Sequence, residues 1–148
     1  MQEIDFENGK TSISAETFKA FQTNVKNAFK NYQIGELTIN TEIVKNGSLT
    51  NVNLTKDENN TVNLSLLWNV DPDMTISSGA DYYVAYLPQE FRPEQNYVYG
   101  GARGEDANGP ASFVVAKNDG RIVLTAFQNS NKIAMSCSFK AQGGIEVW

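Results

Sequence analysis

The sequence has no histidine and only one cysteine among its 148 residues. Without histidine the chain lacks the commonest general base and metal ligand, and a single cysteine excludes a disulfide within the chain. Basic residues are also scarce, because 12 Lys and Arg stand against 17 Asp and Glu and leave a net charge of −5. No apolar run approaches the length of a membrane span. We therefore expect no catalytic residue, no metal, no cofactor, no nucleic-acid partner and no membrane insertion.

What the sequence does contain is typical of a globular protein, since 41% of its residues are hydrophobic and 20% are charged. A chain of this length has room for one domain with a core and for an appended helix. Seventeen asparagines are spread along it. Because asparagine favours tight turns, this richness predicts short strands joined by many turns.

Residues 1–35 are expected to form an N-terminal segment with one amphipathic helix. Ser14 is a suitable N-cap, and a helix that begins there would end before Gly35. Its apolar residues recur at spacings of three and four, as in the seam of a coiled coil, although two heptads are too short for an isolated one. The seam consists of Phe18, Phe21, Val25, Ala28 and Tyr32. Two interpretations stay open: the helix packs on its own domain, or it meets copies of itself.

Residues 36–148 change from a helical period to an alternating one, which predicts β-strands. Asn46-Gly47 lies between two alternating segments and predicts a β-hairpin, and Asn118-Asp119-Gly120 predicts a second hairpin. Strands are expected at residues 37–43, 49–54, 62–68, 82–87, 97–99, 113–116, 122–126 and 133–139. This spacing predicts a mainly β protein, with an antiparallel β-sandwich head of jelly-roll-like type preceded by one short N-terminal α-helix.

Several residues with reactive or polar side chains have a simple structural interpretation. Cys137 lies on the apolar side of the last predicted strand, which indicates an inert core thiol. Trp68 is expected in the core at the end of its strand. Asp71 and Asp73 flank a proline and fit a turn better than a cation site, because the further oxygen ligands of a calcium loop are missing.

The best candidates for ligand binding surround residues 100–109, which are rich in glycine and are expected to form a loop. This loop and the short strand before it carry aromatic, charged and amide side chains, the groups with which proteins bind saccharides and other proteins. The candidates are Tyr97, Tyr99, Arg103, Glu105, Asp106 and Asn108. A solvated connecting loop without a ligand is the alternative.

Two parts of the sequence are similar to proteins of bacteriophage tails. Residues 5–16 (DFENGKTSISAE), followed by Phe18 and Asn24, resemble the segment that precedes a helix in tail and baseplate proteins of phages infecting Gram-positive bacteria. Residues 82–93 (YYVAYLPQEFRP) and 111–122 (ASFVVAKNDGRI) resemble a sequence frame in the C-terminal head domains of phage tail fibres and receptor-binding proteins. We call this second pair of segments the head frame. In it, Pro and Asp-Gly residues have a structural role and none is catalytic.

The resemblance implies a receptor-binding protein of a tail fibre or baseplate, located in the virion after synthesis in the host cytoplasm. It implies a homotrimer in which short helices bundle and β-sandwich heads bind a host cell-wall saccharide, beside other tail and baseplate proteins. Within the head frame, Pro88 and Pro93 would stop strand pairing and hold Phe91 as an apolar plug. We expect adhesion without enzymatic activity. The alternatives are a structural baseplate or tail component that docks another fibre, and a histidine-free polysaccharide depolymerase head.

Overall fold

The computed structural model describes residues 14–30, 33–105 and 109–143, with the side chains of the first helix described as far as residue 24. The chain divides into two compact units, Met1–Gln33 and Ile34–Trp148. The division falls close to residue 35, where the periodicity of the sequence changes. None of the helices in the described ranges is long and apolar enough to span a lipid bilayer.

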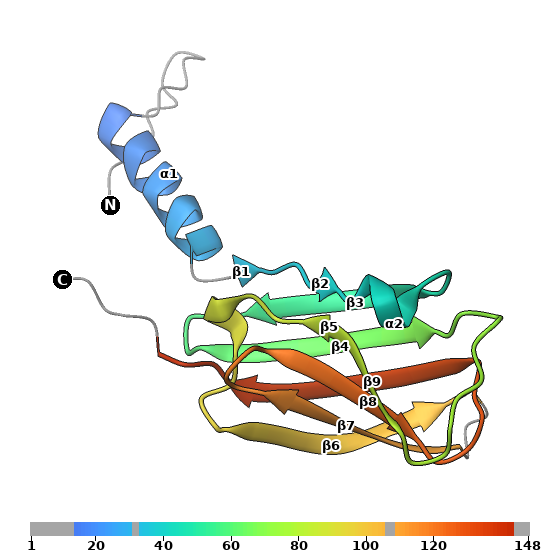
Figure 1. Ribbon diagram of the computed structural model, residues 1–148. Helices are drawn as coiled ribbons and strands as arrows, with labels where there is room; N and C mark the ends of the chain where they lie inside the picture. Colours follow the sequence, from blue (N-terminus) through green and yellow to red (C-terminus); the bar gives the residue numbers. More distant parts are fainter. Residues whose placement is uncertain (1–13, 31–32, 106–108, 144–148) are drawn as a thin grey trace. The chain divides into compact units, whose positions relative to one another are not determined.

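Helix α1 is the described part of the first unit and spans Ala15–Lys30 (Figure 1). Ser14 caps it as predicted, since the Ser14 Oγ accepts a hydrogen bond from the N–H of Thr17 at 3.1 Å. Glu16 lies in the first turn, where a negative charge interacts favourably with the helix dipole. The predicted start of the helix is therefore confirmed, and its end at Lys30 precedes Gly35 as expected.

The structure describes only part of the apolar seam that the sequence predicted for this helix. Phe18 and Phe21 are exposed, with 52% and 65% of their surface accessible to solvent. The side chains of Val25 and Ala28, and the whole of Tyr32, lie outside the described residues. These two aromatic side chains, three residues apart on the helix, form an exposed apolar strip.

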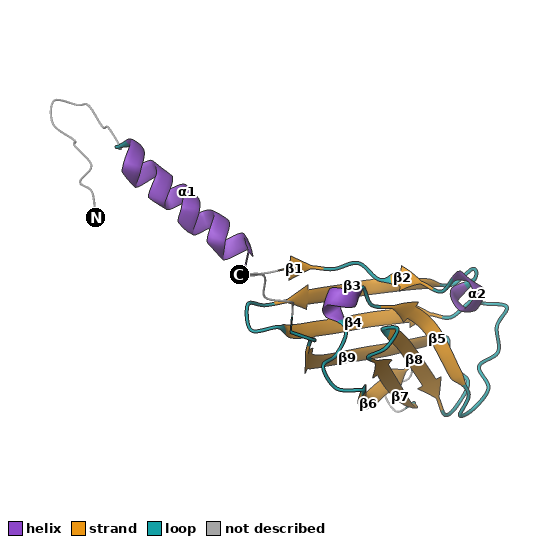
Figure 2. Cartoon of the chain, turned by 60° about the vertical axis from the view of Figure 1, so that its left-hand side comes forward, coloured by secondary structure: helices purple, strands orange, loops and turns teal. Residues whose placement is uncertain are grey.

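The strands form one antiparallel sheet that curls back on itself, with one helix before them (Figures 1 and 2). The predicted fold class, mainly β and sandwich-like, is confirmed. The elements after α1 are β1 (Gln33–Ile34), β2 (Thr38–Ile39), α2 (Thr41–Val44), β3 (Ser48–Lys56), β4 (Thr61–Asn69), β5 (Asp81–Tyr86), a 3-10 turn (Gln89–Phe91), β6 (Tyr97–Gly104), β7 (Pro110–Ala116), β8 (Arg121–Ala126) and β9 (Lys132–Lys140). Across the sheet the strands follow the order β1-β3-β4-β9-β6-β7-β8-β5-β2.

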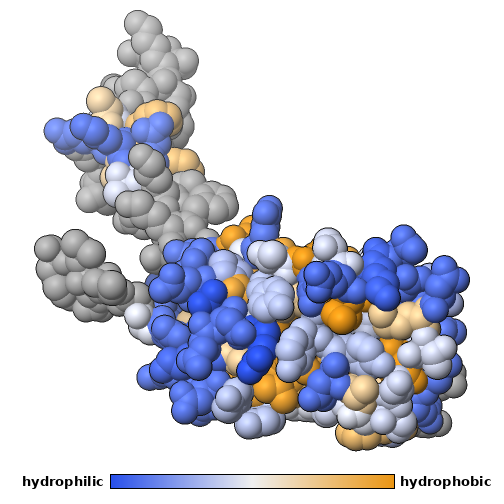
Figure 3. All heavy atoms as spheres, in the orientation of Figure 1, coloured by the Kyte–Doolittle hydropathy of each residue, from blue (hydrophilic) through white to orange (hydrophobic). Residues whose placement is uncertain are grey.

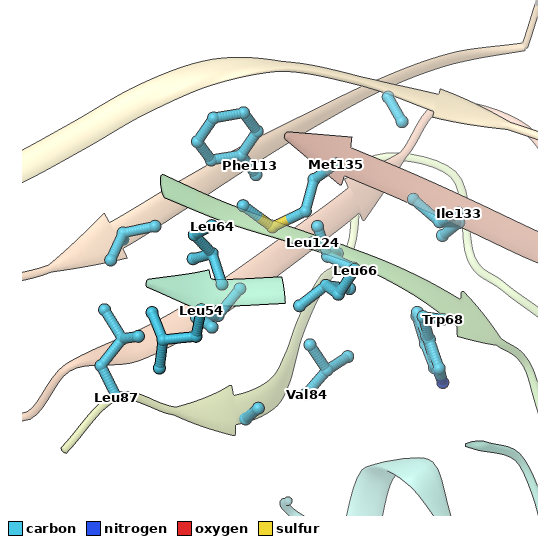
Figure 4. Close-up of a cluster of buried hydrophobic side chains, with 14 of the residues drawn as sticks. Leu54, Leu64, Leu66, Trp68, Val84, Leu87, Phe113, Leu124, Ile133 and Met135 are labelled. Carbon is cyan, nitrogen blue, oxygen red and sulfur yellow. The ribbon is translucent and has the colours of Figure 1, made fainter. Parts of the chain in front are cut away.

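The core lies between the two halves of the curled sheet, and Figure 4 shows buried side chains from several strands gathered in it. Alternate residues of β4 point inward, so that Leu64, Leu66 and Trp68 are all buried. From β5, β7, β8 and β9 they are joined by Val84, Phe113, Leu124, Ile133 and Met135. Each such side chain contributes about 1.5–3 kcal/mol when fully buried, so this cluster is the main driving force for folding. The expected core position of Trp68 is confirmed.

One predicted hairpin is wrong. Asn46-Gly47 follows the helical turn α2 and does not join two paired strands, because β2, which precedes α2, pairs with β5. Asn40 caps α2, since the Asn40 Oδ1 accepts a hydrogen bond from the N–H of Glu42 at 3.2 Å. A Cβ at Gly47 would lie only 2.8 Å from the backbone nitrogen of Asp71. Glycine is therefore needed here for a close approach of two backbone segments, not for a hairpin turn.

Turns predicted elsewhere are confirmed. The connection between β3 and β4 is closed by Asp57, whose Oδ1 accepts hydrogen bonds from the N–H groups of Asn59 and Thr61, both at 2.9 Å. Asn60 in the same turn has a positive φ of 61°, which asparagine tolerates. Gly120, in the turn between β7 and β8, has a φ of 71°, as the Asp-Gly signal predicted.

Candidate functional site

Strand β6 carries the first candidate ligand-binding residues, and it is longer than the sequence predicted. It pairs with β7 from Tyr97, opposite Ala116, to Arg103, opposite Pro110. The glycine-rich segment expected as a loop from residue 100 onward is therefore strand as far as Gly104. Pairing with β7 supplies backbone hydrogen bonds that outweigh the low strand propensity of glycine.

Successive residues of β6 point to opposite sides of the sheet. Tyr97, Tyr99, Gly101 and Arg103 are all exposed, and the residues between them are partly buried. The rings of Tyr97 and Tyr99 lie 5.9 Å apart, centroid to centroid, at an interplanar angle of 46°. The structure therefore brings three of the predicted site residues to one exposed surface. We call Tyr97, Tyr99, Gly101 and Arg103 the β6 face.

A shallow depression of about 310 Å³ adjoins the β6 face where β6 meets β9. It is lined by Gly101, Ala102, Arg103, Ala134, Met135 and Ser136. Within the described residues the two strands pair at only two positions, Arg103 with Ala134 and Gly104 with Ile133. The depression therefore lies where the two halves of the curled sheet begin to separate. A second depression of about 250 Å³ lies farther along the same separation, beside Val98 and Phe139.

Of the other three predicted site residues, the structure describes one. Glu105 is exposed just beyond the end of β6, whereas Asp106 and Asn108 lie outside the described residues. Arg103 forms no ion pair with any described residue. The described part of the chain also holds no group of three or more potential metal-ligating side chains. The β6 face thus offers ring stacking, hydrogen bonding and one positive charge.

The β6 face does not continue as an exposed surface across the sheet, because Val123 of β8, in the row of side chains beside it, is only 6% exposed. Tyr99 lies opposite Val114 of β7, Val114 lies opposite Val123 of β8, and Val123 lies opposite Tyr83 of β5. Tyr83 is 39% exposed, and the guanidinium of Arg121 lies 5.3 Å from its ring centroid. The alternating pattern of these strands is the signal from which the row could have been predicted.

Gly101 and Ser136 are the residues that the structure adds to the candidate site. Gly101 was expected only as part of the glycine-rich loop, but it lies in the middle of a strand and on the exposed side. Ser136 belongs to β9, far from β6 in the sequence, and reaches the depression through the short pairing between these strands. No local sequence signal indicates which strands become neighbours in this way.

Cys137 faces the core side of β9 between Met135 and Phe139 and is partly buried. Burial raises the pKa of its thiol to about 11, so the thiol stays protonated at neutral pH. Because the thiolate is the reactive form, this agrees with the predicted inert thiol.

Asp71 closes a turn after β4 and is 4% exposed. Its Oδ1 accepts a hydrogen bond from the N–H of Asp73 at 2.9 Å, and its Oδ2 accepts one from the N–H of Asn46 at 3.3 Å. These bonds support the turn interpretation of the Asp-Pro-Asp sequence.

The two segments of the head frame contact each other directly. Arg92 reaches the turn between β7 and β8, where its Nη1 donates a hydrogen bond to the carbonyl of Asn118 at 2.8 Å. The N–H of Leu87 donates to the carbonyl of Gly120, also at 2.8 Å. The two segments of the head frame are therefore one structural unit in this fold.

Phe91 is the apolar plug that the head frame predicted, with 2% of its surface exposed. It lies in the 3-10 turn that follows Pro88, and the ammonium of Lys56 lies 5.2 Å from its ring centroid. The role expected of Pro93 is wrong in one respect, because Pro93 forms an isolated bridge with Ala141 and does not stop all strand pairing. This bridge needs no N–H from the proline, so it is compatible with the pyrrolidine ring.

The face shown in Figure 3 has no single dominant apolar area, because its hydrophobic residues form small patches between hydrophilic ones.

In comparisons with known proteins, no protein-family model and no curated protein matches the chain. The function is therefore inferred from the β6 face and from the head frame.

Proposed function

We propose that this chain is the receptor-binding protein of a phage tail fibre or baseplate, and that it binds a saccharide on the host cell surface without enzymatic activity. Three copies assemble through the N-terminal helix, and each β unit presents one β6 face. The protein acts in the virion, beside other tail and baseplate proteins. Several weak sites on one particle give firm adsorption through multivalency.

The observation that carries the adhesive function is the exposed pair Tyr97 and Tyr99. Tyrosine is on average intermediate in burial, and here two adjacent tyrosines on one side of a strand are 46% and 71% exposed. Sugar rings present apolar C–H faces and hydroxyl edges. Tyrosine rings beside Arg103 and the depression match both, because they combine an apolar surface with hydrogen-bonding groups.

The assignment to a phage tail rests on the head frame. Its two segments join through Arg92 and Gly120, and its Phe91 is buried as the frame requires. The resemblance therefore extends over residues that determine the fold of the β unit. This supports a head domain whose binding residues lie elsewhere, on the β6 face.

Adhesion is tested by labelling intact Gram-positive bacteria of several species with the fluorescent full-length protein. We expect Tyr99→Ala to lose most of the labelling, because it removes the most exposed ring of the pair. Tyr83→Ala is the matched control, since it removes an exposed tyrosine from another strand of the same sheet. Equal labelling by the Tyr99 variant contradicts the role of the β6 face.

Trimerisation is tested by light scattering. We expect a mass of three times 16.4 kDa for the wild-type chain and loss of the trimer in Phe21→Asp, which places a charge in the seam. Gln22→Asp introduces the same side chain at an exposed position next to the seam and should leave the trimer intact. A monomeric wild-type protein contradicts the shared seam.

The alternatives give different results in the same set of experiments. New reducing ends released from purified wall polysaccharide would indicate a depolymerase head. Failure to label any of the bacterial surfaces, together with binding to another tail protein, would indicate a structural component that docks a fibre.

A further inference from the structure

Gly101 has no structural reason to be glycine, unlike its neighbours on β6. A Cβ at Gly100 would collide with the ring of Phe113, and a Cβ at Gly104 would lie 2.5 Å from the Oγ of Ser130. A Cβ at Gly101 would meet nothing within 4 Å, and the backbone there does not have a positive φ. Glycine inside a strand destabilises it by roughly 0.5–1 kcal/mol relative to alanine. Such a glycine often marks a place where a ligand or another backbone approaches closely.

The position of Gly101 indicates what approaches. It lies on the β6 face between Tyr99 and Arg103, and it lines the depression that extends toward Ser136. The missing side chain leaves bare backbone between an aromatic ring and a guanidinium group. Both the peptide group and Ser136 can form hydrogen bonds with hydroxyl groups of a ligand.

The length of the β6 face indicates the size of the ligand. Tyr97 and Arg103 are six residues apart on one strand, which corresponds to about 20 Å at 3.3 Å per residue. A single sugar cannot contact both ends of such a surface. A chain of sugars lying along the strand can contact both ends. Its successive units would lie over the tyrosine rings, the backbone at Gly101 and the guanidinium of Arg103.

We propose that the β6 face binds an internal stretch of a linear glycan, and that Gly101 is a specificity-determining residue. One unit stacks on the rings of Tyr97 and Tyr99, and the next lies over Gly101 with its substituents in the depression beside Arg103 and Ser136. Gly101 admits this second unit because it has no side chain. This inference rests on the proposed saccharide-binding function and names the form of saccharide that the site takes.

The test measures binding of the full-length protein to an array of linear oligomers of glucose, galactose, rhamnose and N-acetylglucosamine, from one to six units long. We expect affinity to increase from one unit to at least three. Gly101→Val should weaken binding to the longest bound oligomer at least about tenfold, since even one added methylene in a fitted site changes affinity by about 10–200-fold. Gly143→Val is the matched control, because a Cβ there also meets nothing within 4 Å.

Thermal unfolding of the same variants separates binding from folding. Gly101→Val should unfold at the same or a higher temperature than wild type, because valine favours strands. Undiminished binding by a folded Gly101→Val variant overturns the inference, and so does equal binding of single sugars and hexamers. A change in oligomeric mass in Gly101→Val also overturns it, because the bare backbone would then contact a second copy of the chain. Absence of wild-type binding both to the array and to bacterial surfaces instead contradicts the proposed function itself.

Discussion

The carbonyl of Gly120 accepts a hydrogen bond that connects the two segments of the head frame. Replacing Gly120 with alanine tests how much this connection stabilises the fold. Its φ of 71° lies in the left-handed region, and a Cβ would lie 2.6 Å from the carbonyl oxygen of Leu87. Gly79 has a similar φ of 76°, but a Cβ there would meet nothing within 4 Å. The two glycines therefore differ in close packing and not in backbone conformation.

The expected losses follow from this difference. Alanine in the left-handed region costs roughly 1–2 kcal/mol, so Gly79→Ala should lower the free energy of unfolding by that amount. At Gly120 the Leu87 peptide must also move. This weakens the hydrogen bond from the Leu87 N–H to the Gly120 carbonyl at 2.8 Å and the one from the Arg92 Nε to the Leu87 carbonyl at 3.4 Å. At about 1 kcal/mol for each of these two bonds, Gly120→Ala should cost about 3–4 kcal/mol in total.

Urea unfolding followed by tryptophan fluorescence measures both losses. The effect of alanine on the unfolded chain is the same at both positions, so it cancels in the comparison. We expect Gly120→Ala to unfold at a clearly lower urea concentration than Gly79→Ala, with the slope of the transition unchanged. Equal losses for the two variants would refute the argument that close packing at Gly120 holds the head frame together.

Other predictions concern the core and the thiol. Leu64→Ala should lower the free energy of unfolding by about 2–5 kcal/mol, because Leu64 is only 1% exposed. Leu67→Ala, on the outward side of β4, should lower it much less, and urea unfolding of both variants measures the difference. Alkylation of Cys137 by iodoacetamide should be slow at pH 7 and accelerate toward pH 11, because burial raises the pKa to about 11; rapid reaction at pH 7 would contradict this. The unfolded thiol loses its proton near its ordinary pKa of 9.0, so stability should fall as the pH rises from 9 to about 11, and Cys137→Ala should abolish that decrease.

Local signals predicted the fold well where a turn is closed by its own residues. Asp57 and Asn60 form the turn between β3 and β4 with bonds that span only a few residues, so their sequence was sufficient. Asn46-Gly47 carries an equally strong turn signal, but its partners are backbone groups of Asn69 and Asp71, more than twenty residues away. A dipeptide cannot indicate such a distant approach, and for this reason the predicted hairpin was wrong.

The candidate site shows the same limit. The sequence indicated Tyr97, Tyr99 and Arg103 correctly as exposed side chains, because aromatic and charged residues in a glycine-rich stretch have few partners nearby. It could not indicate that Ser136 of β9 lies beside them, since the pairing of β6 with β9 depends on how the whole sheet curls. It also could not separate Gly100 from Gly101, which differ only in what surrounds them.

Gly100 and Gly101 differ because successive residues of β6 point to opposite sides of the sheet, and only one of these sides packs on the core. Gly100 faces Phe113, so any side chain there displaces a core ring, whereas Gly101 faces solvent and a side chain there displaces nothing in the fold. Folding therefore constrains the even-numbered positions of β6, and the odd-numbered positions are free to serve a ligand. Substitutions on the β6 face should consequently change what the protein binds with little loss of stability, which suits the saccharide recognition that we propose for this surface.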